Sequence, residues 1–142
     1  MPSKAPHWLR QADHDLAAAR TLQGAAHYDW SCFAAQQAAE KALKALYQHH
    51  HAEGWGHTLD LLIEGLLRDE PELAPLRDIA KELDKFYIPT RYPNAHEDRA
   101  PADAYTSAEA TRAIAYAQDI IAFCQARCGA GTGGAGGGQG LG

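Results

Sequence analysis

The chain is poor in cysteine and in long apolar runs, and it has no excess of positive charge. Its three cysteines, Cys32, Cys124 and Cys128, are too few and too irregularly spaced for a disulfide framework or a paired zinc site. We therefore expect reduced thiols, and neither a metal nor another cofactor. Because there is no leader peptide and no apolar run of about 18 residues, the sequence predicts a cytoplasmic protein without a membrane span.

The balance of charge excludes one broad mode of binding. Lys and Arg number 13 against 18 for Asp and Glu, a net charge of −5, which argues against holding nucleic acid through bulk positive charge. A local basic groove is still compatible with this composition. The Glu-x-x-His pairs of a di-iron bundle are absent from the sequence, so that class of helical protein is excluded.

Apolar residues recur at helical spacing in five segments, and no segment alternates as a strand would. The predicted helices run from about 7 to 23, 29 to 51, 58 to 67, 76 to 87 and 106 to 127, with an acidic loop at 68–75. This pattern favours an all-α, antiparallel five-helix bundle, with a four-helix up-and-down core plus a short helix. Residues 1–128 form the helical domain, and we expect the glycine-rich tail 129–142 to be disordered because it cannot bury apolar surface.

The helix predicted at 29–51 is central to this bundle. Alanines fill much of its apolar half, so neighbouring helices can approach closely, and we expect at least two of them to pack against it. Asp29 is the expected N-cap of this helix. Trp30 and Phe33 fall beside its polar sector, which implies that another segment or a second subunit covers them.

Other helix starts also carry capping residues. Ser3 precedes the first helix and Thr58 precedes the third, each as a candidate N-cap. Thr106 and Glu109 have the spacing of a capping box, which predicts that the fifth helix begins there.

Four pieces of the chain together resemble one family. They are WLRQADHDLAAAR at Trp8–Arg20, YDWSCFAAQQAAEKALKAL at Tyr28–Leu46, GHTLDLL at Gly56–Leu62 and FYIPTRYPNA at Phe86–Ala95. In this order and at these separations they are similar to the HEPN family of small helical domains. The resemblance implies a five-helix bundle that forms a homodimer. It also implies partnership with a minimal nucleotidyltransferase encoded beside it, in a pair of the toxin–antitoxin kind.

Other branches of that family are metal-independent ribonucleases, and the resemblance implies a candidate catalytic pair. Their motif is an arginine followed four to six residues later by a histidine, a spacing that Arg91 and His96 share. The arginine would hold the scissile phosphate while the histidine moves the proton of the ribose 2′-hydroxyl. Tyr92 and Pro93 depart from the polar residue usual after the arginine, and Asp98 stands where a tyrosine is usual.

The ligand-binding residues predicted from the sequence are Trp30, Gln37, Lys41, Lys44, His57 and Tyr92. The two lysines could hold a phosphate, or they could belong to a solvated polar face with Glu40 pairing locally. His57 could bind an anion at the start of the third helix, or it could tie its loop to the bundle by a hydrogen bond. Arg91, held between two tyrosines, could bind a ligand or simply stack on them.

Three functions are consistent with these features. The first is a homodimeric nucleotide- or RNA-binding accessory, or toxin–antitoxin partner, of a minimal nucleotidyltransferase. The second is a metal-independent ribonuclease toxin that uses Arg91 and His96. The third is a purely structural helical dimer.

Overall fold

The structure, a computed structural model, describes residues 3–87 and 99–136, with side chains up to residue 129. The predicted all-α bundle is confirmed, because these residues form five α-helices and no strand. The helices are α1 (Ala5–Gly24), α2 (Tyr28–His49), α3 (Leu59–Leu66), α4 (Arg77–Asp84) and α5 (Ser107–Gly136). Two 3-10 turns, η1 (Pro71–Leu76) and η3 (Pro101–Asp103), precede α4 and α5. No helix in the described ranges is both long and apolar enough to cross a bilayer.

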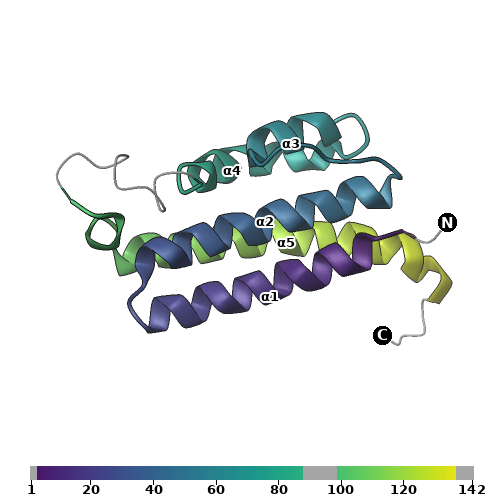
Figure 1. Cartoon of the computed structure of the whole chain (residues 1–142). Helices are drawn as coiled ribbons and strands as arrows, with labels where there is room; N and C mark the ends of the chain where they lie inside the picture. Colours follow the sequence, from purple (N-terminus) through teal and green to yellow (C-terminus); the bar gives the residue numbers. More distant parts are fainter. Residues whose placement is uncertain (1–2, 88–98, 137–142) are drawn as a thin grey trace.

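Three long helices, α1, α2 and α5, lie side by side, and the short helices α3 and α4 cover α2 on the side away from α1 (Figure 1). α1 and α2 form an antiparallel hairpin, and the start of α1 lies at the same end of the bundle as the end of α5. α2 contacts each of the other four helices. The prediction that it is the central helix is therefore confirmed.

Small side chains on α2 allow this close packing. Five of its alanines are fully buried, namely Ala35, Ala38, Ala39, Ala42 and Ala45. Larger apolar side chains from several helices fill the space between them, among them Leu43, Leu46, Leu59, Ile63, Leu66, Leu83 and Ile120. Each such leucine or isoleucine contributes about 2 kcal/mol of hydrophobic stabilisation, so the core holds the five helices in one arrangement.

Gly65, the next-to-last residue of α3, lowers the helical propensity of that segment, and the structure explains why it is there. Tyr47 of α2 donates a hydrogen bond from its hydroxyl to the Leu62 carbonyl at 2.7 Å. A Cβ atom at Gly65 would collide with that hydroxyl, and one at Gly54 would come within 2.6 Å of the Tyr47 ring. Gly54 and Gly65 thus make room for the tyrosine that joins α2 to α3.

One of the predicted helix caps is confirmed, and another is shifted by one residue. Lys4, and not Ser3, holds the N-cap position of α1, although the Ser3 hydroxyl accepts a hydrogen bond from the Ala5 N–H at 3.0 Å. The capping box of α5 is formed in both directions: Glu109 N–H donates to Thr106 Oγ1 at 3.1 Å, and Thr106 N–H donates to Glu109 Oε1 at 2.9 Å. These contacts satisfy N–H groups that a helix start would otherwise leave without acceptors.

Two other cap predictions are wrong in detail. Asp29 lies inside the first turn of α2, and His27 holds the N-cap position. Thr58 holds the N-cap position of α3, but its side chain makes no capping hydrogen bond. The first N–H groups of α3 donate instead to Asp84, which the tertiary fold brings from the far end of α4.

The structure also revises two segment boundaries. Part of the acidic segment predicted as a loop at 68–75 forms the 3-10 turn η1. α5 continues to Gly136, beyond the predicted end near residue 127, since adding residues to an existing helix costs far less than starting one. The rest of the tail lies outside the described residues, so its predicted disorder stays a prediction.

Candidate functional site

The ligand-binding and catalytic residues predicted from the sequence fall into two groups. The first group lies on α2 or in the turn before α3 and comprises Trp30, Gln37, Lys41, Lys44 and His57. The second group lies outside the described residues and comprises Arg91, Tyr92 and His96. The predicted roles of the second group therefore stay predictions, and the geometry available is that of the first.

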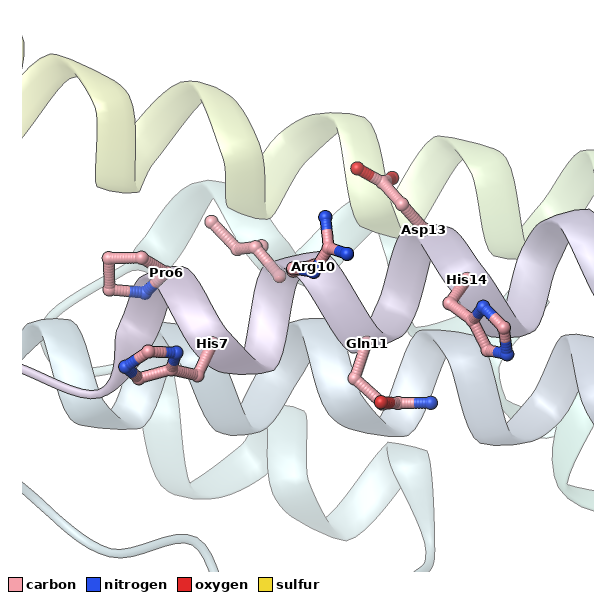
Figure 2. Close-up of a pocket in the computed structure, with 7 residues that line it drawn as sticks. Pro6, His7, Arg10, Gln11, Asp13 and His14 are labelled. Carbon is pink, nitrogen blue, oxygen red and sulfur yellow. The ribbon is translucent and has the colours of Figure 1, made fainter.

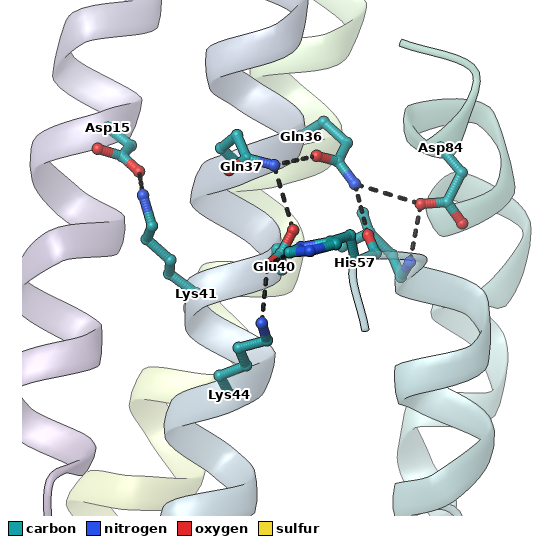
Figure 3. Close-up of polar contacts among 9 residues, drawn as sticks. Asp15, Gln36, Gln37, Glu40, Lys41, Lys44, His57 and Asp84 are labelled. Carbon is teal, nitrogen blue, oxygen red and sulfur yellow. Dashed lines mark hydrogen bonds and ion pairs between the residues drawn. The ribbon is translucent and has the colours of Figure 1, made fainter. Parts of the chain in front are cut away.

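Glu40 lies at the centre of the first group. Glu40 is only 4% exposed, and its carboxylate accepts hydrogen bonds from Lys44 Nζ at 2.9 Å and from Gln37 Nε2 at 3.1 Å. His57 Nδ1 lies 3.0 Å from the same Oε2 atom that Lys44 contacts (Figure 3). A buried carboxylate is stable only when it is paired in this way, so Glu40 fixes the positions of the three side chains around it.

Both lysines of the predicted phosphate-binding face are paired inside the protein. Lys44 pairs with Glu40, and Lys41 pairs with Asp15 of α1 (Figure 3). The side chains of Lys44 and Lys41 are 14% and 25% exposed, so this face is not freely solvated. A phosphate that bound here would have to compete with two carboxylates for the lysines. The local pairing of Glu40, one of the two alternatives from the sequence, is present.

His57 makes the structural hydrogen bond that was one alternative for it. Besides the contact from Nδ1 to Glu40, its main-chain carbonyl accepts a hydrogen bond from Gln36 Nε2 at 2.9 Å. These two contacts tie residues before α3 back to the middle of α2. Nevertheless, the His57 side chain is 56% exposed, so it can also contact a ligand.

Gln36 and Asp84 form a second polar layer that the sequence did not reveal. Gln36 is fully buried and also donates to Asp84 Oδ1 at 3.4 Å. Asp84 accepts hydrogen bonds from the N–H groups of Leu59 at 2.7 Å and Asp60 at 3.1 Å. Burial raises the pKa of the Asp84 carboxyl, and the hydrogen bonds from these donors oppose that rise. The layer joins α2, α3 and the end of α4, which is why no local sequence pattern marks it.

Four rings form a continuous aromatic row along this side of the bundle. Trp30 meets Phe33 edge to face at 5.9 Å between ring centroids, and Phe33 meets Tyr87 at 6.1 Å. Tyr87 stacks on His57 at 5.2 Å with an interplanar angle of 14°. Tyr87 thus covers Phe33, in line with the expectation that another segment would do so, whereas Trp30 remains 46% exposed. Tyr87 is also the residue at which the described chain ends before Arg91.

A separate hollow lies on the outer side of α1 and does not include any of these residues. Its volume is about 930 Å³, and it is lined by Pro6, His7, Leu9, Arg10, Gln11, Asp13 and His14 (Figure 2). All of these residues come from one helix, and most are exposed to solvent. Binding sites for small molecules are usually enclosed and largely apolar, so we place the candidate site at the aromatic row and Glu40 instead.

No group of three or more His, Cys, Asp or Glu side chains within the described ranges is arranged to hold a metal ion. The fold and the site together define an all-α bundle domain with a polar and aromatic face on its central helix. A family model described as the HEPN domain matches residues 5–127. The chain therefore belongs to the HEPN domain family.

Solved structures agree with this assignment. TT1696 from Thermus thermophilus is 45% identical, with a TM-score of 0.84 over 87% of this chain and 98% of that one. The archaeal HEPN homologue ST0689 is 34% identical, with a TM-score of 0.74 over 90% and 99% of the two chains. The HEPN domain protein TM0613 from Thermotoga maritima is 35% identical, with a TM-score of 0.68 over 84% and 94%. No curated protein matches the chain significantly.

Proposed function

We propose that this HEPN protein is a homodimeric nucleotide- or RNA-binding accessory, or toxin–antitoxin partner, of a minimal nucleotidyltransferase. The observation that carries the proposal is the aromatic row, because its exposed indole at Trp30 offers a flat surface on which a nucleobase can stack. Stacking on an aromatic ring contributes about 1–3 kcal/mol per base and needs no net positive charge. It therefore suits a chain whose net charge is −5.

The phosphate contact in this proposal is Arg91, with Tyr92 beside it. Lys41 and Lys44 are already paired with carboxylates, which favours a different cation for that role. Arg91 follows Tyr87 by four residues, a separation that a chain spans with at most about 14 Å. A guanidinium also matches the geometry of a phosphate better than an ammonium does.

Binding of AMP and of a short single-stranded RNA, measured by calorimetry, tests the nucleotide part. We expect Trp30→Ala to weaken binding about tenfold because the stacking surface is lost. Trp55→Ala is the matched control, since Trp55 is 83% exposed but is not part of the aromatic row. Equal affinity in the wild type and the Trp30 variant would contradict the proposal.

Sequencing of the neighbouring genes and co-expression with any minimal nucleotidyltransferase encoded there test the partnership. We expect the two proteins to co-purify, with the HEPN chain present as a dimer. A dimer that binds neither the enzyme nor a nucleotide would favour the purely structural alternative. A monomer that binds neither the enzyme nor a nucleotide would contradict both the proposed function and the structural alternative, because each of them requires a dimer.

The spacing of Arg91 and His96 favours a second candidate function, a metal-independent ribonuclease toxin. Purified protein incubated with RNA and a chelator should then cleave the RNA, and Arg91→Ala and His96→Ala should each abolish cleavage. Equal cleavage by all three proteins, or by none of them, would exclude this candidate.

A further inference from the structure

We infer that His57 is a hydrogen-bond acceptor that recognises the nucleoside part of a bound nucleotide, and not its phosphate. The inference rests on the proposed function, because it concerns the ligand that would stack on the aromatic row. In this role His57 Nε2 accepts a hydrogen bond. In the anion-binding alternative that the sequence leaves open, the same ring would have to donate one.

The contact with Glu40 determines which nitrogen of the neutral His57 ring carries the proton. Glu40 is paired with Lys44, and an ionised carboxylate can only accept hydrogen bonds. The His57 nitrogen that lies 3.0 Å from Glu40 is Nδ1, so Nδ1 must carry a hydrogen and donate it. In the neutral ring this leaves Nε2 without a hydrogen and with its lone pair available.

Three contacts also fix the direction in which that lone pair points. Glu40 holds the Nδ1 edge of the His57 ring, Tyr87 stacks on the face of the ring at 14°, and buried Gln36 holds the main-chain carbonyl. No side chain within the described part of the protein is hydrogen-bonded to Nε2, and the His57 side chain is 56% exposed. The structure therefore presents an oriented, accessible acceptor next to the ring of Tyr87.

The chemistry of the surroundings decides what such an acceptor can bind. It requires an O–H or N–H donor, which ribose hydroxyls and the exocyclic amino groups of bases supply and a fully ionised phosphate does not. Lys44, which contacts the same Glu40 oxygen as His57, has its charge balanced by that carboxylate. A ligand that combines a flat ring for stacking with such donors is a nucleoside.

Two measurements on the full chain test the inference. The first is ¹⁵N NMR of the His57 ring, which distinguishes the two tautomers of the neutral imidazole. We expect the tautomer with hydrogen on Nδ1, and the opposite tautomer would overturn the inference whatever the protein binds.

The second measurement is calorimetric titration with adenosine, AMP and inorganic phosphate. His57→Phe retains a ring to stack on Tyr87 but has no acceptor, and we expect it to bind adenosine and AMP about five- to tenfold more weakly than the wild type. Affinity for phosphate should not change. His57→Gln keeps an acceptor oxygen and should restore part of the affinity, while His14→Phe, on the exposed side of α1, is the matched control.

The possible outcomes separate this inference from the proposed function. Equal binding of AMP by the wild type and His57→Phe would overturn the inference and leave the proposed function intact. Loss of phosphate binding in His57→Phe would also overturn it, in favour of an anion site. If neither adenosine nor AMP binds the wild type, the nucleotide part of the proposed function fails, and the inference fails with it.

Discussion

Glu40 shows how one buried carboxylate organises the polar side of α2. Its pairing with Lys44 could be expected from their spacing of four residues on a helix. Its contact with His57 could not, because the two residues are 17 apart in sequence and meet only after the loop returns along α2. The pairing of Lys41 with Asp15 depends in the same way on the packing of α1 against α2.

Asp84 is the residue whose removal should most directly weaken α3. Its carboxylate accepts the N–H groups of Leu59 and Asp60, so Asp84→Ala leaves both without an acceptor in a partly buried position. We expect the free energy of unfolding, measured by urea denaturation, to fall by about 2 kcal/mol. Asp84→Asn keeps one acceptor oxygen and should lose about half as much.

Glu82→Ala is the control for this prediction, because Glu82 lies on the same helix and is exposed. Its exposed pair with Lys85 should contribute less than about 1 kcal/mol. Similar losses in the Asp84 and Glu82 variants would show that capping by Asp84 is not what stabilises α3.

At the scale of single elements, α3 is the helix that depends most on its neighbours. It has eight residues, which is too short for a stable helix in isolation. Asp84 caps its start, Tyr47 bonds to its Leu62 carbonyl, and Arg77 Nε donates to Asp60 at 2.7 Å. The hydrogen bond from Arg77 lowers the pKa of the Asp60 carboxyl, so α3 and α4 are held together as a pair.

Gly65→Ala should destabilise the protein although alanine is the better helix former. The new Cβ would collide with the Tyr47 hydroxyl, which its hydrogen bond to Leu62 and its packing against Gly54 prevent from moving away. We expect a loss of about 1–2 kcal/mol in the free energy of unfolding.

A double-mutant cycle with Tyr47→Phe isolates the cause. Removing the hydroxyl removes the collision, so Gly65→Ala in that background should be neutral or stabilising by up to about 1 kcal/mol. If Gly65→Ala has the same effect in both backgrounds, the collision with Tyr47 is not the reason for the glycine.

At the scale of the whole molecule, contacts at both ends of the bundle join elements that are distant in sequence. Glu70, which is 7% exposed, lies 2.7 Å from His50 at the end of α2 and 3.3 Å from Arg127 on α5. Near the other end, Gln23 of α1 donates to Thr111 of α5 at 2.6 Å. Together with the apolar core, these contacts join helices that are distant in sequence, so folding of the bundle depends on the whole chain.

The buried thiols give the whole molecule a predictable response to alkaline pH. Burial raises the pKa of Cys32 to about 12 and that of Cys128 to about 11, and it raises the pKa of Cys124 as well. An unfolded thiol titrates near pH ~8.5, so above that value the unfolded chain releases protons that the folded chain retains. This linkage leaves stability intact below about pH 8.5 and reduces it as the pH rises toward 11–12.

Urea denaturation at a series of pH values from 7 to 10.5 measures this effect. We expect a decrease of roughly 1 kcal/mol per pH unit for each thiol that titrates only in the unfolded state. A variant with all three cysteines replaced by alanine has a lower starting stability but should show a shallower decrease. Equal slopes in the two proteins would contradict the prediction.

The sequence by itself determined which segments are helical, which helix is central and where the capping box of α5 lies. Each of these depends on residues within a few turns of one another, such as the buried alanines of α2 or the pair Thr106 and Glu109. Only the tertiary structure decided that Asp84 caps α3, that Asp15 pairs with Lys41, and that His57 joins the aromatic row. Those contacts link residues far apart in the chain, so they exist only once helix packing has brought the residues together.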